Sequence, residues 1–470
     1  MHSGVDPFTG RGRGFWSSLI SALLATALFR CWHILLFFSA WAAMVTLISQ
    51  YTHSLAIQPT LLTVLGTVLG FVISYRTTSS FERYNEGRRF WSAVILGSRT
   101  FARLVWFHVP GIGTDSEEER KARVLLEKKT VINLLEAFGI AIKHYLRGEE
   151  GIFYEDLYHL VKFLPPYALP AGLPSAVDVS EMPASRSMDG TRHSVTRNEP
   201  KKSTEGQLPL PVTSEPRPPT SVSLEIRPGD NSFLLPARNP PQFAIFDVFP
   251  FSLLVHQLTK HGKDIKGKKA ARLRASMKEH VVSQNIPLEI SLYLSSYVSA
   301  LQARKAIDAS MNTSLLNALL SLTDSLTGLE RILTTPIPFS YSIHLWVVTI
   351  IYCLALPFQI WKTLGWITIP GTTVVAFVFF GFLVAGEEIE NPFGYDKNDL
   401  NMDYFTHVVI RNELRAITAL PAPNPAIWAF SDTNDHVFSS SVLKQEMNDC
   451  ASPQEWLRRG LGPMQGALVL

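Results

Sequence analysis

Four long runs of apolar residues dominate the pattern along the chain, with polar segments between them. The runs cover Cys31–Ser49, Ala56–Tyr75, Phe339–Trp361 and Leu364–Ala385. None contains Asp, Glu, Lys or Arg, and about 20 such residues suffice to cross the hydrocarbon core of a bilayer. The pattern therefore predicts four transmembrane helices rather than four buried helices of a soluble protein.

The predicted spans form two hairpins, because short links join the first to the second and the third to the fourth. Gln50–Leu55 joins the first two spans and contains no Lys or Arg. A very short link around Lys362 joins the last two spans. Arginines follow the second run, so the positive-inside rule places that side, both termini and most polar residues in the cytosol. These arginines are Arg76, Arg83, Arg88, Arg89, Arg99 and Arg103.

The polar segments predict a cytosolic helical domain, so the fold is expected to be all-α. Helical spacing continues from the second run through Thr77–Phe107 and recurs in Glu117–Arg147, Leu288–Arg304 and Met311–Leu333. Ile152–Leu164 predicts a short helix that two prolines end. The predicted segments are 1–30 (cytosolic N-terminal segment), 31–75 (first transmembrane hairpin, spans about 31–49 and 56–75), 76–164 (cytosolic helices), 165–241 (insertion), 242–338 (cytosolic helices), 339–386 (second hairpin, spans about 339–361 and 364–385) and 387–470 (cytosolic C-terminal segment).

The segment 165–241 differs from the rest in composition. It holds 15 of the chain's 30 prolines, and Ser, Thr, Arg and Glu make up much of the remainder. Such a segment has too little apolar surface to offset the entropy cost of ordering it. The sequence therefore predicts a disordered insertion.

Composition narrows the class of protein. Apolar residues make up 46%, charged residues 18%, and the mean hydropathy is +0.12. The net charge of +3 lacks the basic surplus of a nucleic-acid-binding protein. Cys31, Cys353 and Cys450 lie far apart and fit neither a disulfide framework nor a zinc site. Without a phosphate-binding glycine loop, an HExxH motif or a nucleophile elbow, the sequence predicts neither an enzyme nor a cofactor.

The second run carries a stripe of residues four positions apart: Thr63, Thr67, Phe71 and Tyr75. Residues at this spacing stack on one side of a helix. A single four-helix subunit packs its own core and leaves no lumen, so a pore requires several copies that each contribute one face. The stripe is the candidate face. The alternative is that Phe71 and Tyr75 only pack against neighbouring helices.

Three segments resemble the bestrophin family, including its bacterial and fungal members. They are Tyr75–Trp91, Glu330–Phe339 and Glu387–Asp396, and they read YRTTSSFERYNEGRRFW, ERILTTPIPF and EEIENPFGYD. Their order and spacing fit the family over roughly residues 25–165 and 243–415. The residues that carry the resemblance are Arg76, Arg83, Glu86, Arg88, Pro336, Pro338, Asn391, Pro392, Phe393 and Gly394.

The resemblance implies a homopentamer whose second membrane helices line one central pore. Counting back from Arg83, the neck residues of the family fall on Thr67, Phe71 and Tyr75, and Thr63 lies at the entrance. Rings of Phe71 would exclude water and ions, and the positive edges of aromatic rings favour anions. Thr67 replaces the aliphatic residue usual in the family and Tyr75 adds a hydroxyl, so we expect a wetter neck.

The resemblance also implies a cytosolic aperture beside a proline at the start of a helix. Here that position is Leu288, which follows Pro287. Glu289 would favour cations if it faced the lumen. The alternative is that Glu289 is a carboxylate of the first helical turn, near the positive end of the helix dipole.

Animal members of the family bind Ca²⁺ through acidic residues after the Asn-Pro-Phe-Gly segment. In this chain Lys397 interrupts the corresponding run, which removes an oxygen ligand and adds a repelling charge. We therefore expect no calcium clasp and no other metal site. Asp396 and Asp399 are expected to cap the next helix instead.

The favoured interpretation is passive conduction of chloride and other monovalent anions by a homo-oligomer in membrane lipid. A cation-conducting relative, a secondary transporter and a non-conducting membrane scaffold or regulator are the alternatives. Transporters usually have more spans and helices broken near the midplane, whereas Pro357 and Pro370 lie near the ends of their spans. No organelle signal is evident, so the plasma membrane is the default location.

Overall fold

The structure is a computed structural model that describes residues 27–58, 60–110, 117–149, 151–165, 234–240, 285–396, 398–421, 423–438 and 451–468. The predicted N-terminal segment lies almost wholly outside these residues, as does most of the predicted insertion. Over the described residues the chain is helical, and β-structure is limited to one isolated bridge between Tyr154 and Leu235. The prediction of an all-α fold is thus confirmed for this part of the chain.

The helices follow one another in two groups along the chain. The first group is α2 (Ala27–Tyr51), α3 (Thr60–Arg103), the π-helix η1 (Leu104–His108), α4 (Glu117–Leu146) and α5 (Tyr158–Val161). The second group is α9 (Ile286–Ala303), α10 (Ala309–Thr334), α11 (Phe339–Leu364), the 3₁₀ turn η3 (Gly365–Ile367), α12 (Thr368–Glu390), the π-helix η4 (Tyr404–Ile410), α13 (Arg411–Ala419), α14 (Pro425–Trp428), α15 (Pro453–Arg459) and α16 (Leu461–Ala467).

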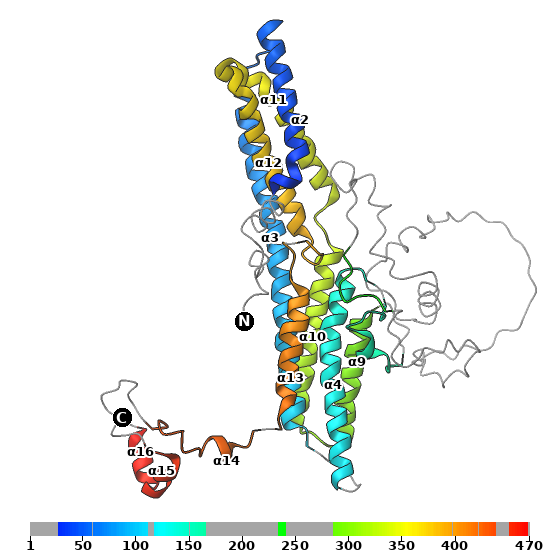
Figure 1. Cartoon of the computed structure of the whole chain (residues 1–470), viewed down its shortest axis with the longest axis vertical. Helices are drawn as coiled ribbons and strands as arrows, with labels where there is room; N and C mark the ends of the chain where they lie inside the picture. Colours follow the sequence, from blue (N-terminus) through cyan, green and yellow to red (C-terminus); the bar gives the residue numbers. More distant parts are fainter. Residues whose placement is uncertain are drawn as a thin grey trace, which may run out of the picture.

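The molecule is elongated and consists of two helical bundles joined end to end (Figure 1). The apolar bundle contains α2, the first half of α3, α11 and α12. The second bundle contains the rest of α3 with α4, α9, α10, η4 and α13. The helix α3 runs through both bundles without interruption, which confirms that the second apolar run continues as one helix. Helices α14 to α16 lie away from both bundles (Figure 1).

The apolar bundle contains the stretches that could cross a membrane. By length and composition, two helical stretches of the described chain qualify, Cys31–Tyr51 and Phe339–Glu390. The second stretch folds back on itself at η3 and so forms the hairpin of α11 and α12. Inside the bundle Phe38 of α2 stacks on Phe380 of α12, with ring centroids 5.3 Å apart.

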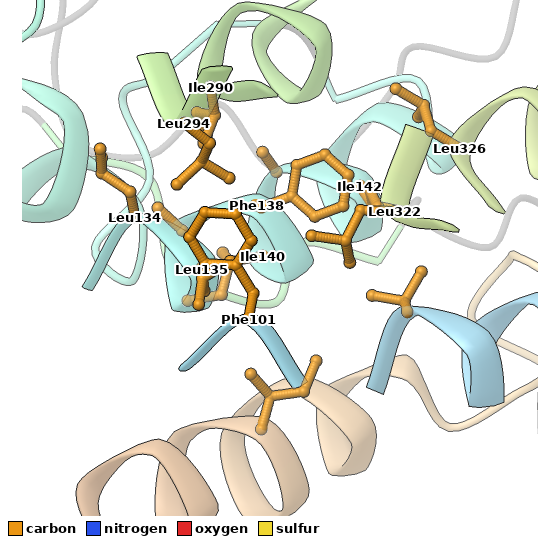
Figure 2. Packing of buried hydrophobic residues seen from close by; sticks show 14 of the residues in the cluster. Phe101, Leu134, Leu135, Phe138, Ile140, Ile142, Ile290, Leu294, Leu322 and Leu326 are labelled. Atoms are coloured by element: carbon orange, nitrogen blue, oxygen red, sulfur yellow. The ribbon is translucent and has the colours of Figure 1, made fainter. Parts of the chain in front are cut away.

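The second bundle has its own hydrophobic core, which Figure 2 shows from close by. Phe138 of α4 lies at its centre, and Phe101 of α3, Leu294 of α9 and Leu322 of α10 surround it, all buried. Along each of these helices, buried apolar residues recur every three or four positions, so each helix presents one apolar side to the others. The core of the second bundle is therefore separate from that of the apolar bundle.

Polar caps fix where the helices of the second bundle begin. Asn285 accepts a hydrogen bond from Leu288 N at the start of α9, and Asp308 does the same for Met311 N at the start of α10. One predicted cap is wrong: Asn401, rather than Asp396 or Asp399, accepts from Tyr404 N at the start of η4, 3.0 Å away. Asp399 Oδ2 instead accepts from Asp396 N inside the preceding turn, 2.7 Å away. The short helix predicted over residues 152–164 is limited to α5.

Residues 234–240 lie within the range predicted to be a disordered insertion, yet they pack against the second bundle. Leu234 is buried, and the backbone of Leu235 pairs with Phe153 and Glu155. Asn239 N donates to the Tyr395 hydroxyl, 3.0 Å away. At least residues 234–240 of the predicted insertion are therefore ordered.

A buried network of charges holds this segment in place. Lys143 is fully buried, and its Nζ lies 2.6 Å from Asp156, 3.2 Å from Asp403 and 3.3 Å from the carbonyl of Ala237. A buried ammonium is unfavourable unless it is paired and hydrogen-bonded, and these three oxygens meet that need.

Asp156 is the acidic centre of the network. His144 Nε2 and His407 Nε2 lie 2.9 and 3.2 Å from its carboxylate. Burial alone raises the pKa of Asp156, but hydrogen bonds from the two histidines and the positive charges of His144 and Lys143 outweigh it and hold the pKa well below its usual range. The carboxylate is therefore ionised in the folded protein at any pH near neutral.

We expect Asp156→Asn to lower stability at neutral pH by about 2 kcal/mol, because Lys143 loses a buried partner. The pKa of Asp156 is lower in the folded state than its ordinary value of 3.8. Its contribution is thus complete above that value and declines as the pH falls below it. Thermal unfolding of the detergent-solubilised protein between pH 3 and 7 checks both points. An equal effect of the substitution at pH 3 and pH 7 would contradict the assignment.

Candidate functional site

The two long sides of α3 differ in burial along its whole length of about 66 Å. One side packs into the chain over both bundles. Its buried residues are Leu62, Leu69, Ile73, Arg76, Ser80, Gly87, Trp91, Val94, Ser98 and Phe101. The opposite side is exposed throughout. Its residues are Val64, Phe71, Thr78, Glu82, Arg89 and Leu96.

The predicted pore stripe lies on this uncovered side of α3. Thr63 and Thr67 are exposed, and Phe71 and Tyr75 keep 74% and 70% of their surface exposed. Such large rings would be buried if they packed in the core of their own chain, so that part of the alternative interpretation is wrong. The Thr67 hydroxyl donates to the Thr63 carbonyl, 3.0 Å away.

Close packing at Gly66 helps to fix the rotation of α3. A Cβ at Gly66 would lie 2.6 Å from the Tyr352 hydroxyl of α11, so any larger residue would force the Tyr352 ring to move. Gly70, one turn further on, has nothing within 4 Å of the same position. The two glycines of the second run therefore have different roles within the chain.

The three motifs that are far apart in sequence meet where the two bundles join. Arg76 is 2% exposed and donates to the carbonyl of Leu383, 3.2 Å away. Its guanidinium also pairs with Glu387 and Glu390, at 3.6 and 3.5 Å. Glu390 in turn accepts a hydrogen bond from Ile337 N, 2.9 Å away, at the link between the prolines Pro336 and Pro338.

Arg83 binds the ends of two helices at once. Its guanidinium donates to the carbonyls of Ile332 and Thr335 at the end of α10, and its Nε donates to the carbonyl of Glu390 at the end of α12, 3.2 Å away. The last carbonyls of a helix have no partner within the helix and carry partial negative charge. Arg83 therefore satisfies groups that would otherwise be left unpaired at this junction.

The other motif residues act around the same junction. Glu86 forms an ion pair with Arg331, and Phe393 is fully buried against Gly87. Asn391 accepts a hydrogen bond from Phe393 N at 3.4 Å. The carbonyl of Pro392 accepts from Leu400 N at 2.9 Å.

Two motif residues differ in how tightly they are held. A Cβ on Gly394 would lie 2.7 Å from Asp399 Oδ2, so a larger residue would displace the carboxylate that accepts from Asp396 N. Arg88 is exposed and has no ion pair with a described residue. The motif thus mixes residues of the junction with one on the surface.

Leu288, the predicted aperture residue, lies in the first turn of α9. It is half-buried and packs against the core of the second bundle, and Glu289 beside it is buried. The preceding Asn285 contacts Tyr145 and Glu330, near the ends of α4 and α10. This end of the second bundle is the one nearer the apolar bundle. The assignment of Leu288 as an aperture stays a prediction.

The ion pairs at the junction were not foreseen from the sequence. Glu387 and Glu390 belong to a recognised motif, but nothing in their spacing indicates that they meet Arg76 of another helix. For metal binding, the described residues contain no cluster of three His, Cys, Asp or Glu side chains that could hold an ion. Lys397 lies outside the described residues.

Comparison with known proteins agrees with this arrangement. A family described as "Bacterial/Fungal Bestrophin protein" matches residues 9–185 and 247–415. A protein of Nostoc sp., named voltage-dependent anion channel-forming protein alr2987, is 26% identical over 396 residues, which cover 84% of this chain and 89% of that protein. A Synechocystis sp. protein, voltage-dependent anion channel-forming protein sll1024, is 41% identical over 137 residues, 29% of this chain and 44% of its own length.

Solved structures share the fold. The crystal structure of a variant of a bacterial bestrophin homolog from Klebsiella pneumoniae superposes with a TM-score of 0.50 at 17% identity. The match covers 84% of this chain and 99% of that one. At this level of identity the likeness concerns the fold, and it includes both bundles.

We expect Arg83→Gln to destabilise the protein by about 2 kcal/mol, because three carbonyls at the ends of α10 and α12 lose their donor together. Arg83→Lys should recover only part of the loss, since an ammonium lacks the planar fork that reaches all three carbonyls. The midpoint of thermal unfolding in detergent measures both. Arg88→Gln removes the same charge from an exposed site of the same helix and serves as the control. Equal effects of Arg83→Gln and Arg88→Gln would contradict the role of Arg83.

Proposed function

The chain belongs to the bacterial and fungal bestrophin family, a family of channels, and on this premise we propose that it is one subunit of an anion channel. In this proposal five copies surround a central axis, and chloride and other monovalent anions cross the membrane passively along it. The membership confirms the resemblance of the three sequence motifs. The number of subunits and the preference for chloride are parts of the proposal.

One observation carries the proposal: α3 is uncovered along its entire length on the side that holds Phe71. A single chain has no lumen of its own, so a pore must form between chains. In a ring of copies the uncovered side of α3 would line the axis through the apolar bundle and continue into the second bundle. The relatives that are named anion channel-forming proteins support the same conclusion.

The neck of the proposed pore consists of Thr67, Phe71 and Tyr75, with Thr63 at its entrance. Phe71 supplies an apolar ring that disfavours water, and such a ring is a barrier to ions. The Tyr75 hydroxyl lies one turn beyond Phe71 and would offer a donor to a partly dehydrated anion. The Thr67 hydroxyl, one turn before Phe71, already donates to the Thr63 carbonyl and makes the neck more polar without offering a further donor. A neck of this composition conducts more readily than an all-aliphatic one.

The proposed topology has four spans: α2, the first half of α3, α11 and α12. Two of the apolar stretches already have the length and composition of spans, and α11 and α12 divide the longer one. The second bundle would then lie in the cytosol, beside the arginines that follow the second span. The plasma membrane is the proposed location.

The proposal is tested with the purified full chain in liposomes or planar bilayers under a salt gradient. We expect the reversal potential to follow chloride. Phe71→Ala should raise the current about fivefold, because removing the ring lowers the barrier by about 1 kcal/mol. Phe382→Ala, which removes an exposed ring from α12, serves as the control and should leave the current unchanged.

Each failure has a distinct meaning. No current from the wild-type protein would overturn the channel proposal in favour of a scaffold or regulator. A reversal potential that follows potassium would identify the cation-conducting alternative. A wild-type current that Phe71→Ala leaves unaltered would show that the pore does not run along this side of α3.

A further inference from the structure

Two charged residues of α3 lie in line with Phe71. Glu82 follows Phe71 by 11 residues and Arg89 follows it by 18. At 3.6 residues per turn these intervals are about three and five whole turns, and they place the two side chains about 16 and 27 Å along the axis from Phe71. Because α3 is unbroken from Thr60 to Arg103, this alignment holds across both bundles.

Both side chains are exposed, and neither forms an ion pair with a described residue. Their charged neighbours on α3 differ in this respect. Arg83 binds the helix ends at the junction, and Glu86 pairs with Arg331. Arg89 has a contact with the ring of Phe90, 5.6 Å from its centroid, which leaves the positive charge uncompensated. The charges of Glu82 and Arg89 therefore act on whatever lies beside the uncovered face.

A surface hollow of about 610 Å³ lies along the same part of α3. Its lining consists of Ser79, Glu82, Arg83, Asn85, Glu86 and Arg89. All six lining residues have a hydroxyl, an amide or a charged group at the end of the side chain, in contrast to the ring of Phe71 in the neck. The change from an apolar to a charged surface occurs within about three turns of one helix.

We propose that Glu82 and Arg89 form two opposed charged belts on the cytosolic side of the neck, and that the Arg89 belt is a binding site for small monovalent anions. This inference rests on the proposed function, since it requires copies of α3 around one axis. Every copy contributes one carboxylate and one guanidinium at fixed heights. An ion that approaches from the cytosol meets Arg89 first, then Glu82, and only then the neck.

The two belts act in opposite directions. Arg89 attracts anions and raises their local concentration at the mouth of the pore. Glu82, nearer the neck, repels anions and admits cations, so it limits the selectivity that Arg89 provides. The belts lie about 10 Å apart along α3, which is close to the screening length at 0.1 M salt. At 0.1 M salt an ion beside one belt is therefore largely screened from the other. In dilute salt the ion responds to both belts, and removal of either charge has its largest effect.

Permeability ratios of chloride to potassium measured at low and high salt test this inference. We expect Arg89→Gln to lower the ratio about threefold at 10–30 mM KCl, and Glu82→Gln to raise it by a similar factor. At about 1 M KCl the screening length is about 3 Å, and both variants should match the wild type. Arg89→Lys keeps the charge and should keep the wild-type ratio.

Arg458→Gln removes a positive charge from exposed α15, far from α3, and is the matched control that should change nothing at either salt concentration. The belts are refuted if the Arg89 and Glu82 variants shift the ratio in the same direction. They are also refuted if the changes in permeability ratio persist at 1 M KCl. A third refuting result is that neither variant differs from the wild type at low salt, although Phe71→Ala still alters the current. That last result would leave the pore itself intact, whereas a wild-type protein that does not conduct would overturn both the pore and the belts.

Discussion

The architecture depends on the contact of one helix with the ends of two others. Arg83 of α3 donates to the last carbonyls of α10 and α12, and Arg76, two turns earlier, pairs with the carboxylates that end α12. Helix C-termini carry unpaired acceptors and negative partial charge, so a guanidinium with several fixed donors suits this position. Through this junction the apolar bundle and the second bundle are held in one fixed relation, although each has a hydrophobic core of its own.

The same junction determines what α3 leaves uncovered. Arg76 and Trp91 lie on its buried side, and a straight helix then presents the opposite side, with Phe71, outward over both bundles. Gly66 fits this rotation because the Tyr352 side chain of α11 packs directly against it. A rigid helix of this length places an apolar ring and two opposite charges in one line. In the proposed pore, the apolar barrier and both charged belts therefore belong to the single helix α3.

Part of this architecture could be predicted from the sequence. The continuous helix from the second apolar run was predictable, because no proline or glycine-rich turn interrupts its spacing. The helices α9 and α10 were predictable for the same reason. The cap of η4 was not, since Asp396, Asp399 and Asn401 are all good caps and the fold of the preceding turn selects among them. The ordered segment 234–240 was missed because its composition resembles the rest of the insertion, while its stability comes from Lys143 and Tyr154.

The sequence by itself determined the class of the protein: apolar runs free of charge need a non-aqueous environment, and three short motifs identify the family. It also placed Thr67, Phe71 and Tyr75 on one side of a helix, since the helical period depends only on the local backbone. Whether that side faces the core or the outside was decided by tertiary structure alone. Burial depends on which neighbours cover a helix, and those neighbours, the ends of α10 and α12, come from residues more than 240 positions away.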